Sequence, residues 1–276
     1  MRPAATPAAR WEGHAPAWWQ DQWRLPELAI YDVISSTSDY ARSRAAAGAP
    51  AGTLVIAEQQ TAGRGRLGRR WHAPAGTALL LSFLLRPEDG VASATAGAIP
   101  LRIGIAVADA IAAASGVECG VKWPNDLVVA GHGKVAGILC EAVTAGDAGM
   151  YIVAGIGINV RQQEGDWPAE LRGSAASLSA CADRPVERAP LAAAVVDAVR
   201  PFFEAPLTLL SAQELASFTR RDALRGRAVL IDDRTTSIAR GIDPDGALVV
   251  EGVTGRQRVM AGIQEVTAPV SDVPSR

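Results

Sequence analysis

The residues that could do chemistry gather in one stretch, VKWPNDLVVAGHGK, at positions 121–134. This stretch holds both lysines of the chain, Lys122 and Lys134, and every other basic residue except histidine is an arginine. An ammonium is a compact point charge that fits where the planar guanidinium fork clashes. A lysine kept against this background indicates a position that arginine cannot serve, so Lys134 is a candidate for stabilising charge between two anions. The alternative is that two lysines survived by chance in an arginine-rich composition.

Two polar residues in the same stretch could meet a phosphate or a metal ion. Asn125 and Asp126 follow a proline and place an amide and a carboxylate at the start of a predicted strand. Carboxylate oxygens suit Mg²⁺, so Asp126 is a candidate for holding Mg²⁺ against phosphates. The alternative is a local Asx turn, in which short polar side chains bond their own backbone. Lys122 could contact a phosphate or could pack its stem.

A second charged group lies in the loop TAGRGRLGRRWHAPAG, at positions 61–76. Its glycines allow close backbone approach to a ligand, and its arginines bring fork-shaped donors. The residues concerned are Gly63, Gly65, Gly68, Arg64, Arg66, Arg69 and Arg70. Because like charges repel, we expect a loop that is mobile when empty and ordered by a phosphate or carboxylate. The alternatives are a solvated basic loop and a nucleic-acid patch. A dinucleotide site is not favoured, because no helix follows the glycines.

Small residues beside these charges would let a ligand lie flat against two strands. They are Ala136 and Gly137 after Lys134, and Gly155 and Gly157 before Asn159. A carboxylate binder, a triphosphate binder and a retained lysine together predict that the protein activates a carboxylate with ATP.

Hydrophobic spacing and cap residues predict the elements that must carry this chemistry. We expect strands at 28–35, 53–60, 77–86, 126–130, 134–144 and 150–160, and helices at 36–48, 100–116, 185–207 and 211–222. Residues 1–10 are expected to form a disordered lead, and segment 161–182 is long enough to be a functional lid. From about residue 224 the pattern changes to short strands, which is typical of a small β-barrel.

Composition excludes several classes of protein. A net charge of −2 and a pI near 6.0 give no reason for general affinity to nucleic acid or membranes. Cys119, Cys140 and Cys181 form no CxxC pair, which favours a reducing compartment. No long unbroken apolar run predicts a membrane span, and the N-terminus lacks the order of a signal peptide. We therefore expect a soluble cytoplasmic protein.

Five segments in this order carry a family resemblance: STS, AEQQTAGRGRLGRRW, KWPNDL, KVAGILCE and GIGINV. The chain resembles the biotin–protein ligases (biotin–[acetyl-CoA-carboxylase] ligases) from about residue 28 to the C-terminal strands. The resemblance implies an α/β (α+β) fold, with a mixed-sheet catalytic domain of the biotin/lipoyl ligase type and a small C-terminal SH3-like β-barrel. We expect the catalytic domain at 28–222 and the barrel at 223–276, preceded by an N-terminal lead and short helix at 1–27 that the local sequence predicts.

The resemblance also implies an activity and its partners. Such ligases make biotinyl-5′-AMP from biotin and ATP with Mg²⁺, and then transfer biotin to one lysine of a biotin carboxyl carrier domain. The acceptor would be the carrier domain of an acyl-CoA or pyruvate carboxylase. We expect neither nucleic acid nor a membrane as a partner, and either a monomer or a homodimer.

The family's site residues carry over to matching positions. Biotin binding is implied for Ser36, Thr37, Ser38, Gln60, Gly63, Arg64, Gly65, Arg66, Lys134, Gly137, Gly155 and Gly157, with Lys134 and Arg64 as catalytic residues. ATP binding is implied for Arg66, Arg69, Trp71, Lys122, Asn125, Asp126 and Asn159, and Asp126 is also the implied Mg²⁺ ligand.

Two departures from the family and two rival functions remain. Ser38 stands where the family usually has asparagine, and the residues before the first strand leave no room for the DNA-binding winged helix of some members. A lipoate ligase or octanoyl transferase shares the fold, and the latter would use Cys140 as its nucleophile. Cys140 lies in an apolar run, which favours a packed core residue. The other rival is a non-enzymatic sensor of biotinyl-adenylate.

Overall fold

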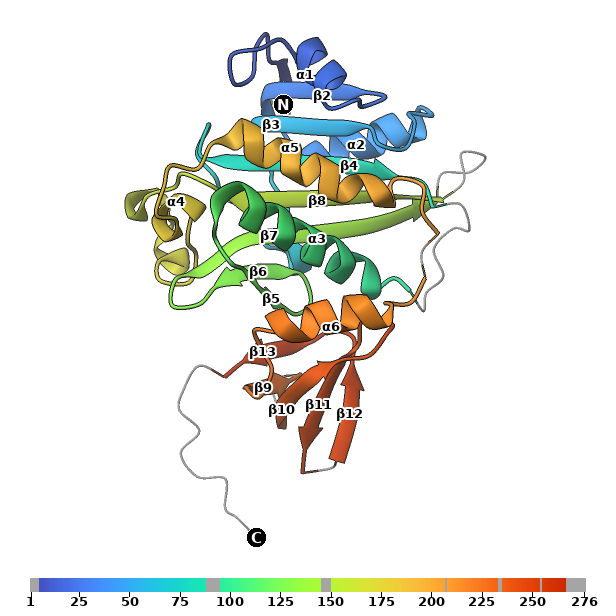
Figure 1. Ribbon diagram of the computed structural model, residues 1–276, viewed down its shortest axis with the longest axis vertical. Coiled ribbons are helices and arrows are strands. Elements are labelled where there is room, and N and C mark those ends of the chain that lie inside the picture. The colour runs from blue at the N-terminus through green and yellow to red at the C-terminus, as the bar shows by residue number, and fades with distance from the viewer. Residues whose placement is uncertain are drawn as a thin grey trace.

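The computed structural model describes residues 5–87, 95–144, 150–206, 208–232, 235–253 and 255–266. It contains an eight-stranded sheet, in the order β1-β2-β3-β4-β8-β7-β6-β5, and a five-stranded sheet, in the order β12-β11-β10-β9-β13 (Figure 1). In the larger sheet β2 and β3 run parallel, whereas the other neighbouring strands pair antiparallel. The predicted mixed-sheet α/β fold is confirmed.

The strands of the larger sheet follow the predicted apolar runs closely. They are β1 (Thr6–Pro7), β2 (Leu28–Ile34), β3 (Leu54–Gln60), β4 (Ala78–Leu85), β5 (Gly120–Lys122), β6 (Asp126–Val129), β7 (Gly133–Thr144) and β8 (Met150–Asn159). Every residue of β4 is buried, as its continuous apolar sequence predicts. The register sets Ser82 of β4 opposite Gly155 of β8, and Gly137 of β7 opposite Gly157.

Helices cover both faces of this sheet. In front of it in Figure 1 lie α3 (Ala98–Ser115) and α5 (Arg188–Val199), whose apolar side chains join those of one sheet face in the main core. The opposite face packs against α2 (Thr37–Ala46) in a smaller apolar cluster. The remaining helices are α1 (Pro16–Gln22), α4 (Leu178–Cys181) and α6 (Ala212–Arg221).

Two helix ends behave as their sequences predict. Ser36 is the N-cap of α2, and its hydroxyl accepts from the Asp39 backbone N–H. Gly116 ends α3 in the left-handed conformation, with φ 78°. By length and composition α3 could cross a membrane, but 67% of its 18-residue window is buried in the protein. It is the central core helix of this fold.

The expectation of a disordered lead at 1–10 is wrong from residue 6 onward; residues 1–4 lie outside the described residues. Thr6 and Pro7 pair with β2, and Trp11 is buried in the main core beside Trp19. Apolar burial of these indole rings fixes a segment whose local sequence gave no sign of a strand.

The smaller sheet is antiparallel and lies below the larger one in Figure 1. Its strands are β9 (Ala228–Ile231), β10 (Thr235–Ile242), β11 (Leu248–Gly252), β12 (Gly255–Val259) and β13 (Ile263–Glu265). The Trp123 indole N–H donates to the Gly246 carbonyl at 2.8 Å, which ties the β5–β6 connection to the β10–β11 turn of this sheet. The boundaries proposed for the two domains stay a prediction.

Candidate functional site

One cavity of about 860 Å³ collects most of the predicted site residues. Those that line it are Thr37, Ser38, Gln60, Arg64, Gly65, Arg66, Arg69, Trp71, Lys122, Asn125, Asp126, Lys134, Gly137, Gly155, Gly157 and Asn159. Gly63 lies in an adjoining hollow, and Ser36 lines neither, because its hydroxyl caps α2. The β13 residues 263–265 also border the cavity, so both sheets contribute to it.

Lys134 is held between a carboxylate and an aromatic ring. Its Nζ lies 2.6 Å from Asp126 Oδ1 and 5.5 Å from the centre of the Trp71 ring. Both charged side chains remain partly exposed to the cavity. Asp126, predicted as a phosphate and metal ligand, is therefore an ion-pair partner of the lysine in this structure.

Trp71 covers the flat surface that the strand glycines form. A methyl group at Gly157 would come within 2.6 Å of its ring, and one at Gly137 within 3.0 Å. In this structure the flat group against these glycines is the Trp71 indole. That a ligand lies flat against the same strands stays a prediction. Its Nε1 is buried and has no hydrogen-bond partner among the described residues.

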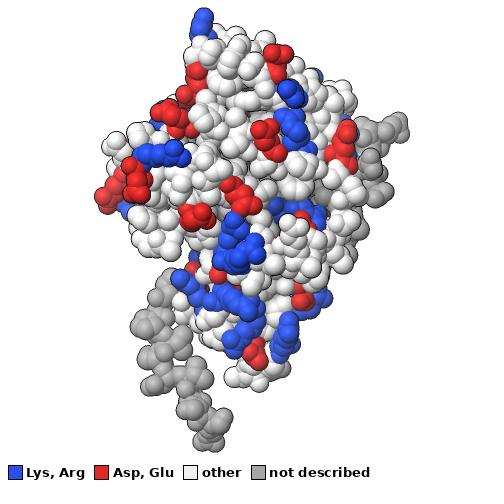
Figure 2. All heavy atoms as spheres, in the orientation of Figure 1, with Lys and Arg blue, Asp and Glu red and all other residues white. Residues whose placement is uncertain are grey.

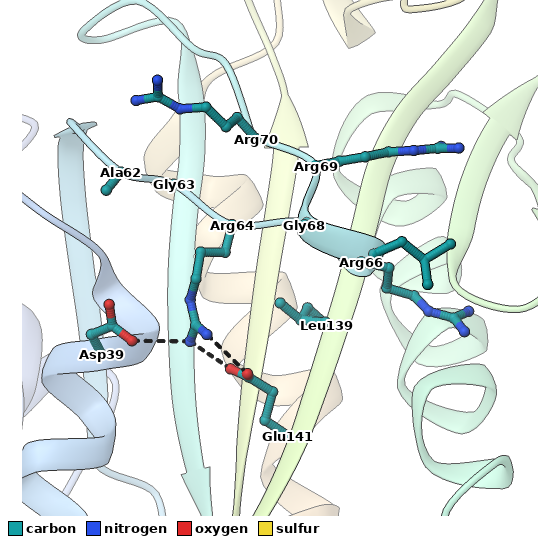
Figure 3. Close-up of a pocket in the computed structure, with 12 residues that line it drawn as sticks. Asp39, Ala62, Gly63, Arg64, Arg66, Gly68, Arg69, Arg70, Leu139 and Glu141 are labelled. Atoms are coloured by element: carbon teal, nitrogen blue, oxygen red, sulfur yellow. Dashed lines mark hydrogen bonds and ion pairs between the residues drawn. The ribbon is translucent and has the colours of Figure 1, made fainter.

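The glycine- and arginine-rich loop at 61–76 forms a hairpin, here called the Arg/Gly hairpin, which Arg64 anchors to the sheet (Figure 3). The Arg64 guanidinium forms two hydrogen bonds with Glu141, at 3.0 and 2.7 Å, and lies 3.0 Å from Asp39 Oδ1. The Trp71 backbone N–H donates to the Gly63 carbonyl at 3.0 Å and closes the hairpin. The expectation of four mutually repelling arginines is thus wrong for Arg64, because carboxylates from α2 and β7 neutralise it.

The other arginines of the hairpin have fewer carboxylate partners than Arg64 among the described residues. Arg66 and Arg69 extend to the same side of the hairpin, away from Glu141 (Figure 3). Burial lowers the pKa of Arg66, and the nearby Asp126 carboxylate offsets only part of this effect. Among the described residues its guanidinium makes one hydrogen bond, a long one of 3.4 Å to Asn125 Oδ1. Arg66 is a partly desolvated cation whose charge a bound anion would satisfy.

Lys122 contacts the C-terminal sheet, which the sequence did not predict. Its Nζ lies 2.5 Å from Glu265 Oε2, and Arg227 lies 2.5 Å from the other oxygen of the same carboxylate. Burial raises the pKa of Glu265, but hydrogen bonds from the two cations outweigh burial and leave the pKa below its usual range. The sequence predicted either that the Lys122 stem packs or that its ammonium meets a phosphate. In this structure the ammonium instead connects the two sheets through its ion pair with Glu265.

Asn159 fastens the 161–182 segment to the sheet. Its amide donates to the Ala176 carbonyl at 3.1 Å, and its Oδ1 accepts from Gln162 at 3.1 Å. The backbone of Lys134 also pairs with this segment, donating to the Ser174 carbonyl at 2.9 Å. The segment borders the cavity and contains two 3₁₀ turns, Glu164–Asp166 and Ala169–Leu171. Backbone hydrogen bonds therefore hold part of this segment against β7.

The hydroxyl-bearing residues at the start of α2 face Gln60 and β4. Gln60 Oε1 accepts from the Thr37 backbone N–H at 2.8 Å, and Ser38 Oγ lies 3.0 Å from Ser82 Oγ. Sequence reasoning missed Ser82, although a serine in the apolar run 77–86 was a visible signal. It also missed Asp39 and Glu141, for which no local pattern existed.

Cys140 does not fit a nucleophile. It packs against the main core, and burial, together with the neighbouring Glu141, raises its pKa to about 12. A thiol that holds its proton this strongly is a poor attacking group near neutral pH. The interpretation of Cys140 as a packed residue is supported.

Comparison with known proteins decides the family. Residues 30–159 match the Biotin/lipoate A/B protein ligase family. The bifunctional ligase/repressor BirA of Bacillus spizizenii is 35% identical over 243 residues, covering 84% of this chain and 71% of that protein. The biotin–[acetyl-CoA-carboxylase] ligase of Paracoccus denitrificans is 32% identical over 220 residues, covering 75% of this chain and 87% of that protein. The chain belongs to the biotin/lipoate protein ligase family.

Solved structures of this family share the fold. The biotin protein ligase from Aquifex aeolicus, in complex with biotin and ATP, superposes with a TM-score of 0.72 at 24% identity. The match covers 88% of this chain and 100% of that one. At this identity the likeness shows that the two chains share a fold.

Proposed function

We propose that the protein activates biotin with ATP to biotinyl-5′-AMP and transfers the biotinyl group to a lysine of a biotin carboxyl carrier domain. Family membership and the names of the relatives support this function. The observation that carries the proposal is that one cavity joins a polar wall, made by Ser38 and Gln60, to the cations Lys134 and Arg66. The polar wall suits the cyclic urea of biotin. The two cations suit a carboxylate and a phosphate that come together.

The proposed roles follow the length of the cavity. The ureido ring of biotin binds at the α2 end, beside Thr37, Ser38 and Gln60, and the carboxylate extends toward Lys134. In the first step a biotin carboxylate oxygen attacks the α-phosphorus of ATP, and pyrophosphate leaves with the bonding electrons. In the second step the acceptor amine attacks the acyl carbon and loses its proton, and AMP leaves. The Lys134 ammonium stabilises negative charge on the phosphoryl oxygens in the first step.

Arg66 is the proposed primary contact for the triphosphate. It is partly desolvated, and the nearby Asp126 carboxylate is already paired with Lys134. An arriving phosphate supplies the anion that this guanidinium lacks. The other proposed nucleotide contacts are Arg69, Trp71, Lys122, Asn125, Asp126 and Asn159.

Mg²⁺ fits this site only as a partner of the nucleotide. Among the described residues no three His, Cys, Asp or Glu side chains group into a metal site. Mg²⁺ is commonly held by one or two carboxylates together with substrate phosphates, and Asp126 would supply the protein oxygen. Bound there, the ion would neutralise phosphate charge.

We assign Arg64 to positioning rather than to direct contact with the reacting atoms. Its guanidinium is engaged by Glu141 and Asp39, so the side chain holds the hairpin onto the sheet. The backbone of Gly63 and Gly65 is then placed beside the proposed biotin end of the cavity.

The proposed partners follow from the same function. The acceptor is the carrier domain of an acyl-CoA or pyruvate carboxylase, and the proposed compartment is the cytoplasm. Nucleic acid is not a proposed partner. Figure 2 shows basic side chains gathering over α6 and the smaller sheet, but acids compensate several of them. Arg240 pairs with Glu251, and Arg258 pairs with Asp243.

Exchange of labelled pyrophosphate into ATP tests the activation step. We expect exchange that depends on biotin and Mg²⁺, with little exchange when lipoate or octanoate replaces biotin. Equal rates with lipoate would move the assignment to the lipoate branch of the family. Tight biotinyl-adenylate binding without any exchange would indicate a sensor instead of an enzyme.

A further inference from the structure

Four polar side chains form a run of hydrogen bonds at the α2 end of the cavity. Gln60 Oε1 accepts from the Thr37 backbone N–H at 2.8 Å and lies 3.1 Å from Thr37 Oγ1. Thr37 Oγ1 lies 2.8 Å from Ser82 Oγ, which in turn lies 3.0 Å from Ser38 Oγ. Ser82 is fully buried and does not line the cavity, whereas the other three residues do.

The chemistry of these groups fixes the direction of every proton. A backbone N–H can only donate, so the Gln60 atom that faces Thr37 is the carbonyl oxygen. Because that oxygen only accepts, the Thr37 hydroxyl donates to it. Each hydroxyl carries a single proton, so Ser82 must donate to Thr37, and Ser38 must donate to Ser82.

The cavity wall therefore has a set polarity. Ser38 has used its proton, so its Oγ offers only lone pairs to a ligand. The Gln60 amide nitrogen has no partner among the described residues and offers donors. A methyl group at Gly155 would come within 2.8 Å of Ser38 Oγ, so the glycine leaves the hydroxyl room against β8.

We propose that Ser82 is a positioning residue that sets ligand specificity by keeping Ser38 a hydrogen-bond acceptor. This inference rests on the proposed function and names a residue that acts without touching the ligand. A cyclic urea presents an N–H donor and a carbonyl acceptor, which match Ser38 and the Gln60 amide nitrogen. The dithiolane of lipoate and the alkyl chain of octanoate present neither, and would leave both protein groups unmatched.

Binding titrations with the full chain test the inference. The ligands are biotin, desthiobiotin, which keeps the urea but lacks the sulfur, and the two mono-N-methyl derivatives of biotin. The variants are Ser82→Ala and Ser38→Ala. The matched control is Ser115→Ala, which removes another buried serine that donates to the Ile111 carbonyl outside the cavity.

We expect Ser82→Ala to weaken biotin and desthiobiotin by about tenfold, the worth of one hydrogen bond to a matched group. Without Ser82 the Ser38 proton turns into the cavity, where it opposes the ligand N–H. The N-methyl derivative that lacks the recognised N–H should bind wild type and Ser82→Ala equally well. The Kd ratio of that derivative to biotin should thus fall about tenfold in Ser82→Ala and stay unchanged in Ser115→Ala.

Three outcomes would overturn the inference. In the first, folded Ser82→Ala keeps the wild-type Kd ratio. In the second, wild type binds both methylated ligands as tightly as biotin. In the third, Ser38→Ala binds biotin as tightly as wild type. This variant also keeps the inference testable if Ser82→Ala fails to fold, because Ser38 lies at the cavity surface. A wild-type protein that binds no biotin contradicts the proposed function itself, so the two failures are distinguishable.

Discussion

Lys134 combines a fixed position with a charge that remains available to a ligand. Asp126 holds its ammonium at 2.6 Å, and the Trp71 ring lies beneath it at 5.5 Å from the ring centre. Both partners attract a cation, through ion pairing and through the ring quadrupole. Since the ammonium is still partly exposed to the cavity, it can be shared with a carboxylate and a phosphate.

The first prediction concerns the size of this cation. Lys134→Ala should lower the rate of biotin adenylation by ~10²–10³, because charge stabilisation is lost where the transition state needs it. Lys134→Arg should fail almost as badly, since a planar guanidinium spreads its charge and cannot place it at the single point that the compact ammonium occupies. Single-turnover formation of the adenylate measures both rates.

Lys122→Arg is the matched control for this prediction. Lys122 lies in the same stretch and also makes one ion pair, with Glu265. We expect Lys122→Arg to lower the adenylation rate less than Lys134→Arg does. Near wild-type adenylation by Lys134→Arg would mean that the ammonium has no special part in the reaction.

Residue types and spacing predicted the cations of the site but not their partners. Arg64 and its carboxylate Glu141 are 77 positions apart in the chain. No local pattern tells which distant acid will meet a given arginine, because the pairing depends on which strands become neighbours. Lys122 and Glu265 illustrate the same limit across two sheets.

At the scale of elements, apolar runs located the strands because a buried strand needs little else. β4 and β8 lie within a residue of the predicted ends. The register then does what sequence alone could not predict, since it sets Gly137 opposite Gly157 and makes a surface on which Trp71 lies. The lead at 1–10 was misjudged because tertiary packing of Trp11 decides its structure.

The second prediction concerns the junction of β5 with β13. Glu265→Gln removes the carboxylate that holds Lys122, so the ammonium becomes available to the triphosphate in the cavity. We expect the KM for ATP to fall severalfold while the KM for biotin stays unchanged. Glu251→Gln is the control, because it breaks an exposed ion pair of the same sheet, with Arg240. An unchanged KM for ATP would leave Lys122 with a purely structural role.

The same pair gives a pH dependence with a definite sign. The pKa of Glu265 is lowered in the folded protein, so the carboxylate stabilises the fold at pH values above the pKa it has in the unfolded chain. This contribution is lost as the pH falls through the lowered folded value. The difference in free energy of unfolding between wild type and Glu265→Gln should therefore be largest near neutrality and shrink on acidification.

At the scale of the whole molecule, segments from both sheets enclose the site. α2 and β3 supply the polar wall, the Arg/Gly hairpin supplies Arg66, and β13 borders the cavity as well. The Arg188 guanidinium is buried between Glu12 and Glu58 and ties the N-terminal segment to β3 through α5.

Intact-mass analysis of a purified biotin carboxyl carrier domain, after incubation with this protein, biotin, ATP and Mg²⁺, tests the central claim most directly. The account predicts one biotinyl group on one lysine, with no modification when ATP is left out. It also predicts almost none with Lys134→Arg, and no comparable addition when lipoate replaces biotin. An acceptor that stays unmodified, or that gains lipoate as readily as biotin, would contradict the account.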